Sequence, residues 1–217
     1  MKISHCKLSK KVQLKLLEYF VLEVTARSAA DLLEINANSA ALYYRKIRQV
    51  IAYHLALEEA ELFDGHIELD ESYFGGVRKR KMGRPTANKV IVFGILKRGG
   101  KVYTVVVENR RTNSLLPVIT RKIKPDSVVY TDSFRSYDVL DVSSFHHERI
   151  NHELLFAEGR NHINGIENFW SQAKRTLRRY NGIDRKYFPL FLKECEFRFN
   201  YGTPSEQLKT LRVWCGI

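Results

Sequence analysis

The sequence lacks the cysteine pattern of a zinc ribbon or of a disulfide framework. Its three cysteines, Cys6, Cys195 and Cys215, lie far apart, are odd in number and include no C-x-x-C pair. Long apolar runs are missing as well, since no stretch approaches the roughly 20 residues that a membrane span needs. The N-terminal residues contain no uninterrupted apolar segment of the kind found in secretory signals. The sequence therefore predicts a cytoplasmic protein with free thiols.

Negative charge is scarce relative to positive charge. The 217 residues include 36 Lys and Arg but only 24 Asp and Glu, which gives a formal net charge of +12. Such an excess favours a polyanionic partner, either nucleic acid or an anionic membrane surface. Because no membrane span is present, nucleic acid is the better prediction. The length of the chain suits one small and one medium domain.

The N-terminal part of the chain has the residue spacing of helices joined by a tight turn. Ser9 can cap a first helix, a short second helix fits residues 26–33, and Ser39 can cap a third helix after a polar turn at 34–38. Two short helices joined in this way are typical of a helix-turn-helix. We therefore expect a small all-α helix-turn-helix domain over residues 1–58.

The third of these helices has two faces of different character. A basic face could enter a DNA major groove, and it contains Tyr44, Arg45 and Arg48. The apolar residues expected to pack inward are Leu42, Ile47 and Ile51. The alternative is a plain three-helix bundle with a solvated basic face, because helix-turn-helix patterns also occur by chance.

Beyond residue 64 the pattern changes to strands. Four strands are expected, at 67–74, 90–98, 101–109 and 127–132. Gly99 and Gly100 predict a two-residue hairpin between the second and third. Near-continuous apolar strands are buried on both faces, so helices must cover the sheet. Such helices are expected at about 112–123, 162–180 and 187–200. Residues 64–217 therefore predict an α/β (α+β) domain, a sheet flanked by helices.

A strongly basic loop joins the first two strands. Residues 78–89 contain six cations in twelve positions, and those that we expect to contact DNA are Arg78, Lys79, Arg80, Lys81 and Arg84. These charges would repel one another unless a phosphate backbone neutralised them. The alternative is a solvated loop that aids solubility.

Three acidic residues occupy positions where secondary structure would hold them rigidly. Asp70 lies inside a strand, where an acid is disfavoured, Asp132 ends an apolar strand, and Glu167 borders the apolar stripe of a helix. Convergent carboxylates can bind the two Mg²⁺ ions that act in phosphoryl transfer. Singly, each acid has an ordinary alternative as an edge-strand charge, a turn or cap residue, or a surface ion-pair partner. The alternating strand pattern also leaves Glu68 as an alternative metal ligand to Asp70, because the two residues share one face of the strand.

Three segments of the sequence, IELDESYFGG, VVYTDSFRSY and NHINGIENFWSQAKR, resemble the three blocks of insertion-sequence DDE transposases, most closely the ISXO-type group. The 34 residues between Asp132 and Glu167, the basic loop ending in MGRP and the Lys seven residues after Glu167 also fit that family. The resemblance covers about residues 64–200. One departure is at the N-terminus, where many relatives carry a zinc ribbon and this chain has no ligands for one.

The resemblance implies a ribonuclease-H-like mixed sheet and a transposase that cuts element ends and joins them to target DNA. Asp70, Asp132 and Glu167 would bind two Mg²⁺ ions, for which Mn²⁺ can substitute, and Lys174 would hold a phosphate or a terminal base. Arg175 and Arg178 would form part of a basic ridge along the donor DNA. The implied partners are double-stranded DNA, as terminal inverted repeats and as target, and a second copy of the chain in a dimer, in a bacterial, nucleoid-associated setting.

Two other functions are compatible with the sequence. One is a non-enzymatic helix-turn-helix regulator, which would need no carboxylate cluster. The other is a ribonuclease-H-like nuclease without strand transfer, because a fold alone does not fix a function. Magnesium-dependent nicking would exclude the first, and joined products would exclude the second.

Overall fold

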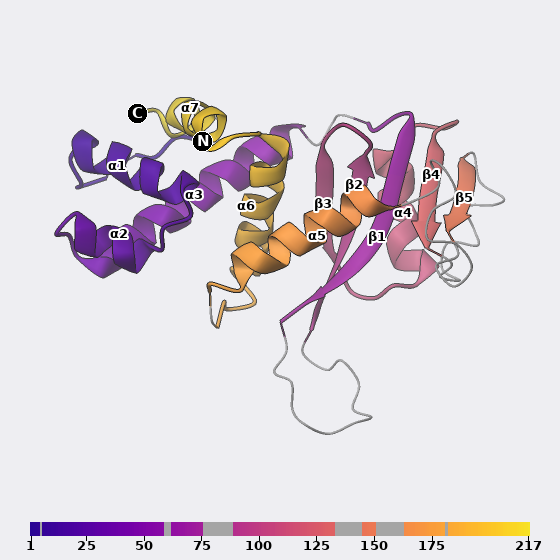
Figure 1. The fold of residues 1–217 in the computed structure, drawn as a ribbon, viewed down its shortest axis with the longest axis horizontal. Helices are drawn as coiled ribbons and strands as arrows, with labels where there is room; N and C mark the ends of the chain where they lie inside the picture. The colour runs from indigo at the N-terminus through magenta and orange to yellow at the C-terminus, as the bar shows by residue number, and fades with distance from the viewer. Residues whose placement is uncertain (5, 59–61, 76–88, 133–144, 151–162, 181) are drawn as a thin grey trace, which may run out of the picture. The chain divides into compact units, whose positions relative to one another are not determined.

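The computed structural model describes the chain except for residues 5, 59–61, 76–88, 133–144, 151–162 and 181 (Figure 1). The chain divides into two compact units. One comprises Met1–Ala60 and Thr176–Ile217, and the other comprises Glu61–Arg175. The expectation that residues 64–217 form a single domain was therefore wrong, because the C-terminal helices belong to the same unit as the N-terminal ones. None of the helices described is both long and apolar enough to cross a bilayer.

The first unit is entirely helical. Its helices are α1 (Lys10–Val21), α2 (Ala26–Leu32), α3 (Ala37–Glu58), α6 (Phe188–Asn200) and α7 (Pro204–Cys215). The Ser9 cap is confirmed, since the Val12 amide donates to Ser9 Oγ at 3.4 Å. The cap expected at Ser39 was wrong. Helix α3 begins two residues earlier, where the side chain of Asn36 accepts from the Asn38 amide at 2.8 Å and so satisfies a free N–H of the first turn.

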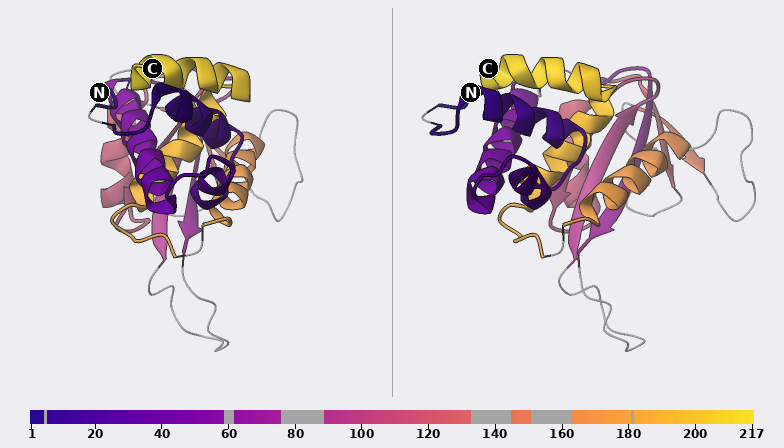
Figure 2. Two further views of the ribbon diagram at one scale, coloured as in Figure 1. Left: turned by 90° about the vertical axis from the view of Figure 1, so that its left-hand side faces the viewer. Right: turned by 60° about the vertical axis from the view of Figure 1, so that its left-hand side comes forward.

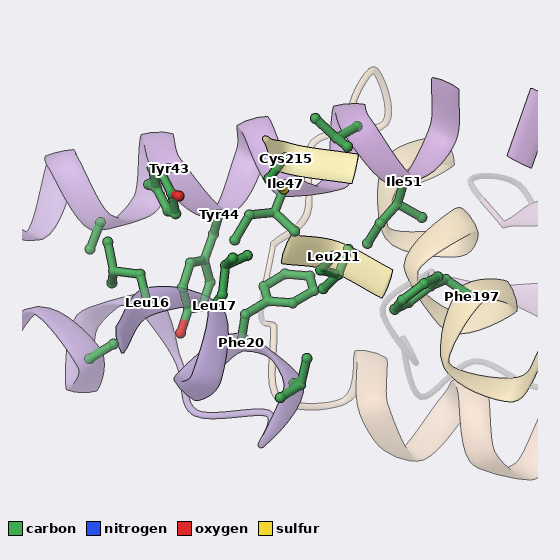
Figure 3. Packing of buried hydrophobic residues seen from close by; sticks show 14 of the residues in the cluster. Leu16, Leu17, Phe20, Tyr43, Tyr44, Ile47, Ile51, Phe197, Leu211 and Cys215 are labelled. Carbon is green, nitrogen blue, oxygen red and sulfur yellow. The ribbon is translucent and has the colours of Figure 1, made fainter. Parts of the chain in front are cut away.

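The core of this unit joins residues from both ends of the sequence (Figure 3). Phe20 of α1 meets Tyr44 of α3 edge to face at 5.1 Å, and Phe197 of α6 and Leu211 of α7 are fully buried in the same cluster. Each such side chain contributes about 1.5–3 kcal/mol relative to an exposed one. Helices α6 and α7 therefore complete the hydrophobic core of the N-terminal helices.

The second unit is built on a mixed five-stranded sheet. The strands are β1 (His66–Phe74), β2 (Val90–Lys97), β3 (Val102–Val107), β4 (Val128–Asp132) and β5 (His146–Ile150). Their order is β3-β2-β1-β4-β5; β1, β2 and β3 form an antiparallel meander, and β4 and β5 run parallel to β1. This topology confirms the ribonuclease-H-like prediction. A hairpin between β2 and β3 is confirmed, with φ of +69° at Gly99, but its expected two-residue length was wrong. The Lys97 N–H donates to the Lys101 carbonyl oxygen at 3.1 Å, so three residues, 98–100, connect the strands.

Two helices cover the two faces of this sheet, α4 (Thr112–Lys122) and α5 (Asn164–Leu177), as Figure 2 shows. Ile67 and Leu69 of β1 point toward α4 and form a core with its Leu115. Alternation along β1 then directs Glu68 and Asp70 to the opposite face, beneath α5. The sheet therefore presents its acidic residues to the helix that carries Glu167.

Two glycines let α5 approach the sheet closely. A Cβ atom on Gly94 of β2 would lie 2.6 Å from Cζ2 of Trp170, and one on Gly165 of α5 would lie 2.6 Å from Cδ2 of Leu96. Real Cβ atoms do not reach such distances. Glycine at these two positions is therefore what allows the helix and the strands to pack in contact.

Candidate functional site

Asp70 lies in the middle of β1, half-buried under α5. Its Oδ2 accepts a hydrogen bond of 3.0 Å from the indole nitrogen of Trp170. Burial, with smaller contributions from the negative charges of Glu71 and Asp132, raises the pKa of Asp70 to about 7. A neighbouring positive charge would stabilise the ionised form of this carboxyl group.

Asp132 ends β4, the parallel neighbour of β1. The paired register of β1 and β4 ends at Glu68 and Tyr130. Continued by two residues along both strands, the same register would place Asp70 level with Asp132. The charge of Asp132 acts on Asp70, which agrees with this placement. The structure thus brings two of the three predicted acids together where the carboxyl end of β4 lies beside the middle of β1, and ligand sites of α/β sheets tend to form at such strand ends.

Glu167 lies in the first turn of α5 and is exposed. It precedes Trp170 by three residues, or about 4.5 Å along the helix axis, so it belongs to the helix segment that lies over Asp70. Within the described residues, no group of three or more His, Cys, Asp or Glu side chains is assembled as a metal site. The structure therefore places Asp70 and Asp132 together and puts Glu167 on the covering helix, exposed to solvent.

Glu68 has a different position from Asp70, a distinction that the alternating strand pattern left open. It is only 1% exposed, and its Oε1 pairs with Arg98 Nε at 2.9 Å. Its Oε2 accepts the amide of Ile166 at 2.9 Å, so this carboxylate also satisfies a free N–H at the start of α5. Glu68 therefore attaches the helix to the sheet, whereas Asp70 is the residue adjacent to Asp132.

The residues at this end of the sheet suit a divalent cation. Carboxylate oxygens are the hard ligands that Mg²⁺ and Mn²⁺ prefer. The negative charge of Asp132 contributes to the raised pKa of the half-buried Asp70, and a cation bound between the two carboxylates would offset that repulsion. The chemistry of this donor set therefore fits the metal that the sequence predicts.

The predicted basic residues of α5 are exposed. Lys174 extends beside the ring of Phe74, with its Nζ 6.0 Å from the ring centre, and Arg175 follows it on the surface. Helix α5 ends at Leu177 rather than at residue 180, so Arg178 lies in the turn that follows. All three cations are accessible to a polyanion.

On α3, the prediction that Tyr44 and Arg48 face DNA was wrong. Tyr44 is 1% exposed and its hydroxyl donates to the carbonyl oxygen of Val24 at 3.1 Å. Arg48 is 5% exposed, and its Nε lies 2.6 Å from a carboxylate oxygen of Glu194 on α6. An arginine can be buried at this position because a buried carboxylate accompanies it. Both residues belong to the core of the helical unit.

The exposed face of α3 is therefore displaced from the predicted one. Leu42, expected to pack inward, is 51% exposed, whereas Ile47 and Ile51 are buried as predicted. Arg45 is exposed, with its guanidinium 4.5 Å above the ring of Tyr187. Asn38 and Gln49, which the sequence interpretation missed, are exposed on the same helix. Their spacing of three or four residues from Leu42 and Arg45 is a local pattern that could have placed them on the same face.

The predicted contact residues of the basic loop, Arg78, Lys79, Arg80, Lys81 and Arg84, lie outside the described residues. Their role is unchanged as a prediction from sequence. The adjoining Lys89 is described, and its Nζ lies 5.8 Å from the ring centre of Tyr73.

Comparison with known proteins shows that residues 62–200 match the family of the ISXO2-like transposase domain. An uncharacterized transposase-like protein of Haemophilus influenzae is 60% identical over 112 residues, which are 52% of this chain and 91% of that protein. An uncharacterized protein in the transposable element ISH50 of Halobacterium salinarum is 27% identical over 168 residues, 68% of this chain and 57% of that protein.

The chain is also similar to solved structures of Mos1 complexes. The Mos1 strand transfer complex gives a TM-score of 0.43 at 12% identity, covering 100% of this chain and 78% of that one. The Mos1 transposase paired-end complex with the left transposon end gives a TM-score of 0.38 at 11% identity, and the match covers 100% of this chain and 79% of that one.

Proposed function

Because the chain belongs to the ISXO2-like transposase domain family, we propose that it is the transposase of a bacterial insertion sequence, binding the element ends and catalysing metal-dependent DNA cleavage and strand transfer. The observation that carries the proposal is that Asp70 and Asp132, on adjacent parallel strands, lie close enough for the charge of one to act on the other, with Asp70 beneath the helix that bears Glu167. A regulator that only bound DNA would have no need for two interacting acids at this end of the sheet.

In this proposal Asp70, Asp132 and Glu167 hold two Mg²⁺ ions, which Mn²⁺ can replace. The bound ions would supply Lewis-acid activation of a water or a 3′-hydroxyl and neutralise charge on the scissile phosphate. Asp70 keeps its orientation through the indole of Trp170. Glu167, exposed in the first turn of α5, would complete the set from the helix side. Lys174 would hold a DNA phosphate as a compact positive charge.

The DNA would contact both units. Helices α2 and α3, joined by a short turn in which Glu34 has a φ of +52°, form the proposed helix-turn-helix. The exposed face of α3 would enter the major groove with Asn38, Arg45 and Gln49, side chains suited to base edges. Phosphates would be bound by the basic loop, Arg175 and Arg178. Two copies of the chain would hold the two element ends together.

The experiment that tests this function is incubation of the purified chain with a supercoiled donor plasmid carrying candidate element ends, with and without Mg²⁺. We expect Mg²⁺-dependent nicking followed by joined products, and sequencing of the junctions identifies them. Hydrolysis without joined products would instead assign a nuclease. Binding without any nicking would assign a regulator and contradict the proposal.

The contribution of α3 is tested by Arg45→Ala. The substitution is expected to weaken binding to element-end DNA roughly tenfold, about 1.4 kcal/mol, and to reduce the slope of log K against log salt by about 0.9 if the contact is to a phosphate. The melting temperature should fall only slightly, because Arg45 is exposed and loses only its surface contact with Tyr187. Lys209→Ala, which removes an exposed cation from α7, is the matched control. Equal affinity in the two variants would exclude Arg45 from the DNA interface.

A further inference from the structure

The position directly opposite Asp70 in the sheet has no side chain. In the register of β1 and β2, Asp70 pairs with Gly94. Residues paired in this way have their Cβ atoms about 4.5–5.5 Å apart, so any larger residue at 94 would stand beside the carboxylate. The indole of Trp170 occupies this space instead, since a Cβ on Gly94 would lie 2.6 Å from Cζ2 and 2.9 Å from Cη2. Gly94 therefore makes room for Trp170 next to Asp70.

The indole is fixed in this position by its neighbours. Trp170 is 4% exposed, and its ring lies 5.9 Å from that of Phe74 and 4.9 Å from that of Phe169. Its Nε1 is 3.0 Å from Oδ2 of Asp70. An indole N–H can only donate, so it favours the ionised carboxylate and restricts its rotation about the Cβ–Cγ bond.

The helix that carries Trp170 is itself attached to the same strand. Glu68, two residues before Asp70, accepts the amide of Ile166 at 2.9 Å, and Arg98 pairs with Glu68 at 2.9 Å. Gly165 permits this close approach, because a Cβ there would lie 2.9 Å from Oε2 of Glu68. The start of α5 is thus held at Glu68 and its next turn at Asp70. The donor on Trp170 has little freedom to leave the carboxylate.

We propose that Trp170 is a positioning residue for Asp70, holding the carboxylate in the orientation in which it binds a divalent cation; this inference rests on the proposed function. Carboxylates that bind metals are themselves usually hydrogen-bonded, and loss of such an outer partner lowers metal affinity about 10–100-fold. Because the indole N–H already holds Oδ2, the carboxylate loses less rotational freedom when a cation binds, and this favours binding.

The test removes the N–H donor without changing the shape of the ring. The chain has two tryptophans, Trp170 and Trp214, and both can be replaced biosynthetically by benzothienylalanine, in which sulfur stands for N–H. Mn²⁺ affinity is measured without DNA, from the electron paramagnetic resonance of free Mn²⁺, and thermal unfolding checks the fold. Because the analogue also replaces Trp214, the variant Trp214→Phe, produced with ordinary tryptophan at position 170, shows whether a change at position 214 alone affects Mn²⁺ binding.

We expect the analogue-containing chain to bind Mn²⁺ at least about tenfold more weakly, and Trp214→Phe to bind it normally. Phe169→Leu, which alters packing next to the indole but keeps the donor, should lower the melting temperature without changing Mn²⁺ affinity. An unchanged affinity in the analogue-containing chain would overturn the inference. A purely structural role for Trp170 would be indicated if affinity followed the melting temperature across the variants.

Asp132→Asn, titrated in the same way, separates this inference from the proposed function. If the unmodified chain binds Mn²⁺ and Asp132→Asn does not, the carboxylate site stands and the analogue alone decides the role of Trp170. If the unmodified chain binds no Mn²⁺, or Asp132→Asn binds it equally well, the metal site itself is wrong and the inference falls with it.

Discussion

Asp132→Asn is expected to abolish DNA cleavage and strand transfer while leaving DNA binding intact. The substitution removes one of two interacting carboxylates but keeps the size and hydrogen-bonding capacity of the side chain at the end of β4. Charge stabilisation by a bound cation contributes several kcal/mol to phosphoryl transfer, and each 1.36 kcal/mol is about tenfold in rate. We therefore expect a loss on the order of a thousandfold or more. Asp70→Asn should behave in the same way.

Cleavage of a donor plasmid in Mg²⁺ and gel-shift binding to the same ends, both measured on each variant, separate chemistry from affinity. Asp126→Asn is the matched control, because it makes the same change of charge in the same unit at an exposed position. Its φ of +64° is a conformation that asparagine tolerates. Mg²⁺-dependent cleavage retained by Asp132→Asn would contradict the assignment of the site.

The positions of these acids in the secondary structure could be predicted because strands have a local pattern. Alternation along β1 and the apolar run of β4 placed Asp70 inside one strand and Asp132 at the end of another. The separate role of Glu68 could not be predicted. It depends on Arg98, 30 residues away, and on the amide of Ile166, 98 residues away, and no local pattern records such contacts.

The exposed face of α3 and the division into units were predicted less well for the same reason. Helical spacing allows either Leu42 or Arg48 to point inward, and burying an arginine is costly unless an acid is present. That acid is Glu194, 146 residues further along the chain. Helix α7 was missed although Thr203 and Glu206 form a capping box at its start, a local pattern that could have revealed it.

Glu194 joins three helices of the first unit through buried charge. Its carboxylate is 1% exposed and lies 2.6 Å from Arg48 of α3 and 2.7 Å from Arg198 of its own helix. Arg198 in turn donates to the carbonyl oxygens of Phe20 and Val21 at the end of α1, at 2.7 and 3.1 Å. Burial opposes the ionisation of Glu194, yet the charges of Arg198 and Arg48 hold its pKa below the usual range. The pairing is thus what permits three charged groups inside a hydrophobic core.

Glu194→Leu is therefore expected to destabilise the first unit by about 3–5 kcal/mol, because it leaves the guanidinium of Arg48 buried without a carboxylate. Urea unfolding followed by the fluorescence of Trp214, whose ring lies 5.5 Å from that of Phe197, measures the change. The double variant Arg48→Met with Glu194→Leu should recover part of the loss, since it removes the unpaired charge of Arg48, whereas Arg198 keeps only its hydrogen bonds to the carbonyl oxygens of Phe20 and Val21. If the single variant were as stable as the double one, the ion pair would contribute nothing to joining α6 to α3. If Glu194→Leu lowers the free energy of unfolding by this amount, substitutions at Glu194 would weaken DNA binding indirectly. Glu194 is buried and would not contact DNA itself, but its loss would destabilise α3.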